Sequence, residues 1–501
     1  MGIPVCRSRR SPAAAWRPPL PSAALVALVA LVVLAPAGPA RGASRPRLNP
    51  APGAGEAGRR AAALDIRFDL EVVDRLIGLR TRGAATEDEI DAWVRLPGNR
   101  ELLRQGRIER TLTPAILAAA ARAVINGQAF DGPPTLGSLP GGDWGDLDRI
   151  VVALRSGSGA LAASASAALV PCLPVDRTLP PLIVYFHLGG SWDGRTTDAV
   201  YINLTFFQSR GYASLPGLDA LLVHELFHLA QGALLPWVED YGSRQSALYT
   251  LLLRTEQEGI ARHLEYRRLR EAAVGTEVDR TNLAKYEDGL RRVQENAALL
   301  ARFQGALDAR RMDEARRVAS EGFLGGGPLY AVGHSMADTI ESQAGTAALA
   351  GTVVTGPLAF TRAYLDSAGA MPLVPDGMIT ALGELEAGYG RDPVRASRLR
   401  REGLRLLVNA RPGDAIDILK QAVRLDPSDA TSAYNLACSW ALLGREKKAL
   451  RWLAAAFDRG FTDYKHAAND EDFTSLRSSP EFAALLRSRG FNYRRPAAAT
   501  P

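Results

Sequence analysis

Two histidines lie four residues apart in the stretch LDALLVHELFHLAQG (residues 218–232), and a glutamate directly follows the first of them. On an α-helix, His224 and His228 would share one face and could direct two imidazole nitrogens at a single point. Glu225 is the residue after His224, so its side chain lies further around the helix. Its carboxylate could reach a water bound to a metal ion at that point instead of binding the metal ion itself. This is the H-E-x-x-H arrangement of a zinc site, in which zinc acidifies a bound water and the glutamate accepts its proton.

The residues around these three polar side chains are almost all apolar, from Leu221 to Leu229. The motif helix is therefore expected to be buried on most of its faces. A buried carboxylate without a partner is unfavourable by several kcal/mol, whereas one beside a metal ion is not alone. A bound metal explains why Glu225 lies here; the alternative is a pair of hydrogen-bonded core histidines beside a salt-bridged glutamate.

A catalytic zinc site uses three protein ligands and keeps a fourth position open. The stretch TLLLRTEQEGIARHLEYRRLRE (250–271) is expected to form a long helix that offers Glu256 and Glu258. The side chains of two residues that lie two positions apart on a helix point about 200° apart around its axis, so only one of these glutamates can face the metal. Gly259 would let this helix approach the motif helix closely, which favours Glu258. Glu256 is the alternative ligand, or else a solvated partner of nearby arginines, and His263 is expected to be exposed.

The combination of HELFH with EGIA (258–261) resembles the gluzincin, or peptidase MA-like, clan of zinc metallopeptidases. Within that clan it most resembles bacterial predicted zinc peptidases with a helical N-terminal part. The resemblance covers roughly residues 64–385. It implies a zincin-like catalytic domain that hydrolyses peptide bonds, with Zn²⁺ as the cofactor and His224, His228 and Glu258 as its ligands.

The same resemblance implies a hydrogen-bond donor to the oxyanion of the tetrahedral intermediate, because gluzincins commonly place a tyrosine or histidine near the metal. The segment GGGPLYAVGHSMADTIE (325–341) puts Tyr330 and His334 one helical turn apart. Tyr330 is the candidate donor and His334 the reserve. A well-aimed donor is worth about 2.7–4 kcal/mol; the alternative is that both residues pack between helices.

The elements that would position these residues follow from the periodicity of the apolar residues. Residues 64–170 are expected to be mostly helical, and PLIVYFHL (181–188) and AVYINLTFF (199–207) to be strands. The GGSWDGRTTD stretch between them has the glycines and aspartates of a hairpin loop. Helices then continue to about residue 385, so the predicted fold class is α+β and mostly helical. By resemblance to the clan, the strand 199–207 is the edge strand along which an extended substrate pairs; the alternative is an internal strand.

The C-terminal part contains an internal repeat. Shifting the sequence by 34 residues superposes Ala415 on Ala449, Leu419 on Leu453, and Ala422 on Ala456. Small residues at these positions let paired helices approach closely, and the period resembles that of tetratricopeptide repeats. Two units are fewer than the three or so that a stable stack needs, so 469–490 is expected to be a helical cap. The prediction is a TPR-like helical domain over 396–490 that could bind a protein partner.

The formal net charge of +6 is concentrated at the N-terminus, where Arg7, Arg9, Arg10 and Arg17 precede the apolar run 23–35. Small residues follow this run, as in a secretory signal peptide over residues 1–40. The run is short for spanning about 30 Å of hydrocarbon, which favours cleavage over a permanent anchor. Removing these four charges from +6 leaves +2, which argues against an electrostatic nucleic-acid binder. Residues 41–63 are rich in Pro, Gly, Ala and Arg and are expected to form a flexible linker.

These observations together predict an exported zinc-dependent peptidase, periplasmic or secreted, that acts on a peptide or protein substrate and carries a helical repeat module for a partner. If the signal segment is not cleaved, the protein is anchored in the inner membrane. The alternative is a non-catalytic envelope scaffold with a zinc site and TPR-mediated protein binding. The intact Glu225 favours the peptidase, because a purely structural zinc site needs no general base.

Overall fold

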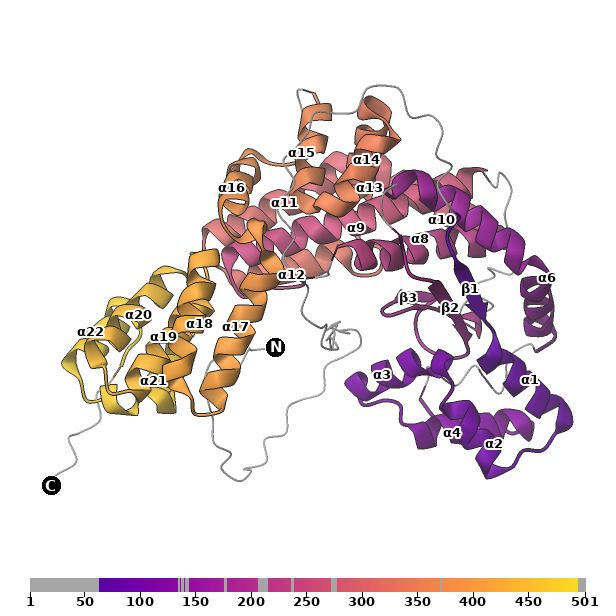
Figure 1. Ribbon diagram of the computed structural model, residues 1–501, viewed down its shortest axis with the longest axis horizontal. Coiled ribbons are helices and arrows are strands. Elements are labelled where there is room, and N and C mark those ends of the chain that lie inside the picture. The colour runs from indigo at the N-terminus through magenta and orange to yellow at the C-terminus, as the bar shows by residue number, and fades with distance from the viewer. Residues whose placement is uncertain are drawn as a thin grey trace. The chain divides into compact units, whose positions relative to one another are not determined.

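The sheet of the protein joins segments that lie far apart in the sequence, as the computed structural model in Figure 1 shows. Its spatial order is β1-β2-β4-β3. The strands are β1 (Ile66–Asp69), β2 (Leu182–His187), β3 (Gly194–Thr196) and β4 (Val200–Asn203). β1, β2 and β4 run parallel, and β3 is antiparallel to β4.

This topology corrects two expectations about the strands. β2 and β4 were expected to form a hairpin, but they pair in parallel, and the hairpin is formed by β3 and β4. The segment 199–207 was expected to supply the edge strand, but β4 lies inside the sheet with all four residues buried. Among the strands that the structure describes, β3 forms the edge on this side. β1 is a further strand, inside the region 64–170 that was expected to be mostly helical.

The structure describes residues 63–133, 136, 139, 144–174, 178–205, 215–235, 238–271, 277–369 and 372–493. The expected signal peptide (1–40) and all but the last residue of the expected linker (41–63) lie outside these ranges. The described residues belong to one compact unit.

The helices that follow β1 form a group that packs on the sheet. α1 contacts β2, and α6 contacts β1. α2 begins at a capping box, in which Thr86 and Glu89 satisfy each other's main-chain N–H groups. The helices are α1 (Glu71–Arg82), α2 (Glu87–Val94), α3 (Arg100–Glu109), α4 (Pro114–Ile125) and α6 (Trp144–Leu169), with 3₁₀ turns η1 (Pro97–Asn99) and η2 (Val170–Cys172).

The long helices α8 and α9 follow the sheet and pack against each other, and α8 also contacts β2, β3 and β4. Figure 1 shows them between the sheet and the later helices. The elements of this part are α8 (Leu215–Leu234), α9 (Arg244–Glu271), α10 (Glu277–Arg291), α11 (Val293–Asp308), α12 (Met312–Phe323), α13 (Pro328–Ala344), α14 (Thr346–Thr355), α15 (Pro357–Ser367), α16 (Asp376–Ala387) and η3 (Tyr389–Arg391).

The C-terminal part consists of helix pairs, in which α17 packs on α18 and α19 on α20. The repeated alanines and leucines at a spacing of 34 are all buried, and Gly403 leaves the space that the Leu419 side chain fills. The elements are α17 (Pro393–Val408), α18 (Pro412–Leu425), α19 (Ala430–Leu442), α20 (Glu446–Asp458), α21 (Tyr464–Asn469), η4 (Glu471–Leu476) and α22 (Pro480–Ser488). Their assignment to the tetratricopeptide class stays a prediction.

Two separate hydrophobic clusters stabilise the described residues. One extends from Val72 to Ala396 and includes the sheet and helices α1 to α16, and the other extends from Leu406 to Tyr493. A small sheet among many helices confirms the α+β, mostly helical class. The boundaries expected from the sequence, 64–385 and 396–490, stay predictions.

Polar contacts connect the beginning of α9 to the C-terminal helices. Ser397 donates a hydrogen bond of 2.6 Å to Asp240, and Arg400 forms an ion pair with the same carboxylate. Ser243 donates to Asp426. These groups are all buried. Hydrogen bonds and an ion pair between them therefore connect the two hydrophobic clusters.

One described helix, Trp144–Cys172, is long and apolar enough to cross a membrane, as judged by length and composition. Core helices pass the same test, and α6 packs against α8 and β1.

Candidate metal centre

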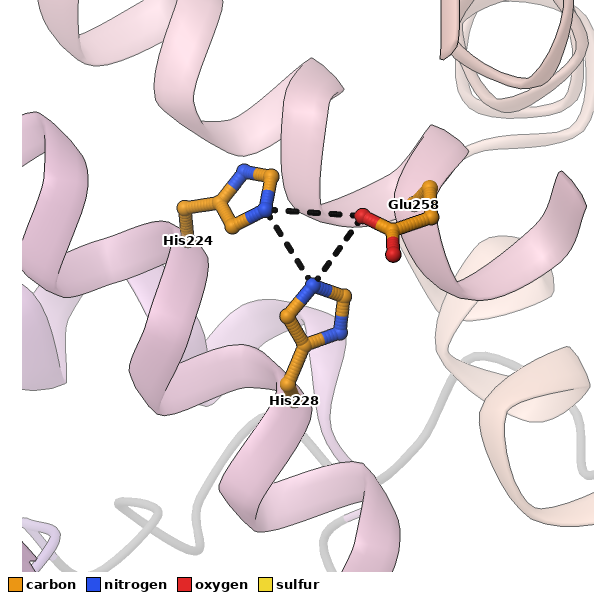
Figure 2. Close-up of side chains that lie close together, drawn as sticks. All are labelled: His224, His228 and Glu258. Atoms are coloured by element: carbon orange, nitrogen blue, oxygen red, sulfur yellow. Dashed lines mark hydrogen bonds and ion pairs between the residues drawn. The ribbon is translucent and has the colours of Figure 1, made fainter. Parts of the chain in front are cut away.

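The motif helix α8 presents two imidazoles to one point because its histidines are four residues apart. Leu222, Val223, Leu226 and Phe227 are fully buried around them, so packing fixes the rotation of the helix. Nε2 of His224 and Nε2 of His228 lie 3.1 Å apart. Figure 2 shows both nitrogens directed toward the same point.

Helix α9 supplies the third donor, Glu258. Its Oε2 lies 3.6 Å from Nε2 of His224 and 3.3 Å from Nε2 of His228. Of the two carboxylates considered from the sequence, Glu258 is the one brought to the histidines (Figure 2). The Glu256 side chain is fully buried elsewhere, and neither of its oxygens has a hydrogen-bond partner among the described residues. Burial raises the pKa of Glu256 well above its ordinary value, which favours the neutral acid.

The spacing of the three donor atoms fits a tetrahedral metal ion. Two ligands about 2.0–2.1 Å from a tetrahedral centre lie about 3.3 Å apart, and the observed separations are 3.1, 3.3 and 3.6 Å. Two imidazoles and one carboxylate are a donor set that zinc accepts, with a fourth position left for water or substrate. Among the described residues, His224, His228 and Glu258 form the group that could hold a metal ion.

A second carboxylate, Glu265, supports His224, and this residue was not among those expected from the sequence. Nδ1 of His224 donates to Glu265 Oε2 over 2.9 Å. Tyr286 donates to the other oxygen over 2.8 Å, and Arg262 lies 3.3 Å away. Glu265 follows Glu258 by seven residues, two turns of the same helix face, and this spacing was the signal that could have identified it.

The ionisation of these groups follows from burial and from their mutual contacts. Burial alone would lower the pKa of His224, but hydrogen bonds to Glu258 and Glu265 outweigh it and raise the pKa to about 10. Burial would raise the pKa of Glu265, yet the charge of Arg262 and the bond from His224 lower it to about 2. Burial would also raise the pKa of Glu258. The charge of His228 and the hydrogen bonds from both histidines outweigh burial and hold this pKa well below its ordinary range. Metal binding at these donors would therefore release protons.

Glu225 lies against the edge strand β3, on the neighbouring side of α8. Thr196 Oγ1 is 2.6 Å from Glu225 Oε2 and 2.9 Å from the main-chain oxygen of Glu225. The Glu225 residue is 9% exposed. Burial raises its pKa, and the two imidazoles of the motif oppose this rise. Its carboxylate is thus held beside the metal donors without being one of them.

The glycine beside Glu258 has a different role from the expected one. Gly259 was expected to let α9 approach the motif helix, but it lies against Gly333 of α13. A Cβ atom placed on Gly259 would lie 2.3 Å from the carbonyl carbon of Gly333. The two glycines therefore let α9 and α13 approach closely, and α13 is the helix that carries Tyr330.

Tyr330 lies at the centre, and its ring stacks on that of His224 with centroids 6.5 Å apart. Its hydroxyl lies within the electrostatic influence of the Glu258 carboxylate. Burial, and then the Glu258 charge, raise the pKa of Tyr330 well above its ordinary value, so the phenol keeps its proton and remains a donor. The Arg262 guanidinium lies 4.9 Å from the centre of the Tyr330 ring.

His334 is not brought to the metal donors. Its ring lies 5.2 Å from that of His263 and 4.9 Å from that of Tyr266. Burial lowers the pKa of His334 to about 3, so the ring is neutral. The reserve role expected from the sequence does not fit this position. The expectation that His263 is exposed was wrong too: it is 3% exposed and bonds to Glu341 over 2.7 Å.

Residues 147–370 match the model of a protein family whose description is "Putative zinc dependent peptidase (DUF5700)". This range includes α8, α9 and α13, and with them all the donor residues described above. The match supports a zinc peptidase family in general, and together with the His-His-Glu group it indicates zinc as the metal.

A curated chloroplast protein of Arabidopsis thaliana is 29% identical over 90 residues, 17% of this chain and 27% of that protein. The chain thus spans about a quarter of the length of this relative. No solved structure matches the chain significantly.

Proposed function

We propose that the chain is an exported gluzincin-type zinc peptidase, in which His224, His228 and Glu258 hold the metal and Glu225 is the general base. The observation that carries this proposal is the convergence of three donor atoms within 4.8 Å, with a separate buried carboxylate beside them. A structural site would use a fourth protein ligand and would need no such carboxylate.

The residues of the chain would divide the reaction among them. Zinc held by the three donors supplies a Lewis acid and lowers the pKa of water there toward about 7. Glu225 accepts a proton from the attacking water and passes it to the nitrogen of the leaving amine as the peptide bond breaks. The Tyr330 hydroxyl, which burial and the Glu258 charge keep protonated, would donate a hydrogen bond to the oxyanion of the tetrahedral intermediate.

The edge strand β3 offers a substrate-binding rim. The main-chain oxygen of Asp193 accepts a hydrogen bond of 2.9 Å from the N–H of Asn203 in β4. The N–H of Thr197 donates one of 3.0 Å to the main-chain oxygen of Ala199, directly before β4. In an antiparallel pair, alternate residues direct their main-chain groups to the same side. The main-chain groups of Gly194 and Thr196 therefore point away from β4, where an extended peptide could add a strand.

The helical repeat module is proposed to bind a protein partner, as TPR-like helix pairs do. The buried contacts of Asp240 and Ser243 with Ser397 and Asp426 fix this module to the segment directly before α9. A bound partner would then be held near the proposed peptidase domain. Export through the N-terminal signal peptide is part of the same proposal.

The substitution Glu225→Gln tests the mechanism in the purified mature chain loaded with zinc. Because the amide cannot accept the proton, we expect unchanged zinc content and a loss of roughly 10²- to 10⁴-fold in the cleavage of an unfolded protein or a peptide library. Undiminished cleavage by this variant would overturn the proposal.

The behaviour of the wild-type chain separates the alternatives. Bound zinc with turnover of small esters or amides and no peptide cleavage would indicate another zinc hydrolase. Bound zinc with no turnover at all would favour the envelope scaffold that binds partners through its repeats.

A further inference from the structure

The carboxylate of Glu225 touches two residues of the edge strand, Gly194 and Thr196. They lie two positions apart on β3, so both present their Cα substituents to the face of the strand that α8 covers. Gly194 lies against the Glu225 side chain, and Thr196 makes a hydrogen bond to it. Arg195, the residue between Gly194 and Thr196, points to the opposite face of β3.

The Thr196 hydroxyl is placed to fix the orientation of the carboxylate. A hydroxyl has one proton to donate, and its two possible acceptors here are Glu225 Oε2 at 2.6 Å and the Glu225 main-chain oxygen at 2.9 Å. The carboxylate oxygen is nearer and charged, and charge-assisted hydrogen bonds are the shorter and stronger kind. This bond occupies Oε2 and leaves Oε1 for the proton of the attacking water.

Gly194 lies against the other side of the same carboxylate. A Cβ atom placed on it would be 3.0 Å from Cγ and 3.1 Å from Oε1 of Glu225. An alanine here would thus require the Glu225 side chain to move by a few tenths of an ångström. The strand therefore limits the side chain sterically on one side and bonds to it on the other.

The third residue of β3 holds the strand in place. Arg195 points to the opposite face, where its Nε lies 2.9 Å from Oε1 of Glu101 in α3. Glu101 is buried, and Arg104 binds it through two hydrogen bonds of 2.6 Å. A strand of three residues is thus anchored on its far side to a buried ion-paired network.

From this geometry we propose that Gly194 and Thr196 are positioning residues that set the orientation of the general base. The inference rests on the proposed function, because it assigns Glu225 as the base. The main-chain groups of these two residues point to the open edge of the sheet, where the substrate is proposed to pair. The same strand therefore aligns the base with the peptide bond, and a shift of β3 would misplace both.

The test compares Thr196→Val, which removes the hydroxyl at nearly constant shape, with Thr196→Ser, which keeps it. Thr197→Val is the matched control on the same hairpin, because Thr197 is exposed and does not contact Glu225. For Thr196→Val we expect kcat on the peptide that the wild type cleaves to fall roughly 10- to 100-fold, as for other residues that support a catalytic group. KM, zinc content and the thermal midpoint should stay close to those of the wild type. Thr196→Ser should recover most of kcat, and Thr197→Val should not change it.

Gly194→Ala is the second variant, and it keeps the inference testable if Thr196→Val does not fold. It should lower kcat with zinc still bound. A kcat of Thr196→Val within threefold of the wild type, or equal losses in the Val and Ser variants, would overturn the positioning role. If Glu225→Gln is inactive in the same assay, such a result sinks this inference alone and leaves the proposed function standing.

Discussion

Glu265 accepts a hydrogen bond of 2.9 Å from Nδ1 of His224, from a position two helical turns beyond Glu258. A histidine that binds metal through Nε2 must carry its proton on Nδ1, so this contact fixes both the tautomer and the orientation of the ring. Tyr286 and Arg262 hold Glu265 in turn. In the proposed metal site, Glu258 would thus act as a ligand and Glu265, on the same face of α9, as the support of another ligand.

Replacement of Glu265 by glutamine should weaken zinc binding while leaving the three donors in place. The amide keeps the size of the side chain but loses the charge that stabilises the Nδ1 proton. We expect the zinc affinity to fall roughly 10- to 100-fold, as is typical for partners of metal ligands. Competition with a chromophoric chelator measures this, with Glu271→Gln at the exposed end of α9 as the control. An affinity within threefold of the wild type would contradict the role of Glu265.

Replacement by glutamine should weaken zinc binding at Glu258 and leave it unchanged at Glu256. Glu258→Gln removes the anionic ligand, so zinc affinity should fall by more than the roughly 100-fold expected for a supporting residue. Glu256→Gln should leave zinc binding unchanged, because Glu256 does not lie with the donors and burial favours its neutral form. Zinc titrations of the two variants check this pair. Loss of zinc from the Glu256 variant alone would show that the third ligand is assigned to the wrong residue.

Helical periodicity predicted that His224, His228 and Glu258 come together, because the three residues lie on two helices whose inner faces can be deduced from spacing alone. Four residues separate the histidines, and the 200° between Glu256 and Glu258 allows one of the two to face the metal. The same reasoning could have reached Glu265. Three ligands complete a catalytic site, so the spacing of the ligands alone assigns no role to a further carboxylate such as Glu265.

The sheet could not be predicted in the same way, because pairing between strands depends on contacts distant in sequence. β1 has four residues and pairs with β2 across more than a hundred positions, with no local signal for that partner. The three residues of β3 lie within a stretch whose glycines and aspartates indicate a turn. The identity of the edge strand, and with it the contact of Thr196 with Glu225, therefore became visible in the structure alone.

Tyr330 should contribute to the rate and not to metal binding. Tyr330→Phe removes the hydroxyl proposed to donate to the oxyanion, and we expect a fall of roughly 10²- to 10³-fold in kcat with full zinc content. His334→Gln is the comparison, since His334 lies against His263 and Tyr266 and should leave kcat nearly unchanged. Steady-state kinetics with zinc analysis decide this, and a larger loss from the His334 variant would reverse the assignment of the donor.

The close contact between α9 and α13 should be intolerant of a single methyl group. A Cβ atom on Gly333 would lie 2.2 Å from the main-chain oxygen of Thr255 and 2.7 Å from Cα of Gly259. Because backbone atoms lie on both sides, Gly333→Ala should reduce the free energy of unfolding by about 1–3 kcal/mol. Gly305→Ala in α11 is the matched control, with open space around the new atom and an expected gain of about 0.5–1 kcal/mol. Denaturant unfolding measures both, and equal effects of the two variants would refute the close approach.

The ion pair of Glu341 with His263 should make part of the stability depend on pH. Hydrogen bonding to His263 is the largest of the effects that lower the pKa of Glu341 from 4.5 to about 2; Thr346 and Arg267 act in the same direction, and burial opposes them. A carboxyl with a lower pKa in the folded chain than in the unfolded chain binds fewer protons when folded. Its contribution to stability is therefore fully present above about pH 4.5 and is lost as the pH falls from 4.5 toward 2.

Glu341→Gln should accordingly destabilise the chain more at pH 6 than at pH 3, because the wild-type advantage at that site disappears in acid. The measurement is denaturant unfolding of the metal-free chain at both pH values, so that loss of zinc in acid does not contribute. Glu321→Gln, which removes a surface pair with Arg302, serves as the control and should have a small effect at either pH. An equal loss of stability at pH 6 and pH 3 in the Glu341 variant would mean that the residue acts through packing. The charge of Glu341, which lies 2.7 Å from His263 and 3.0 Å from Arg267, would then contribute nothing measurable to stability.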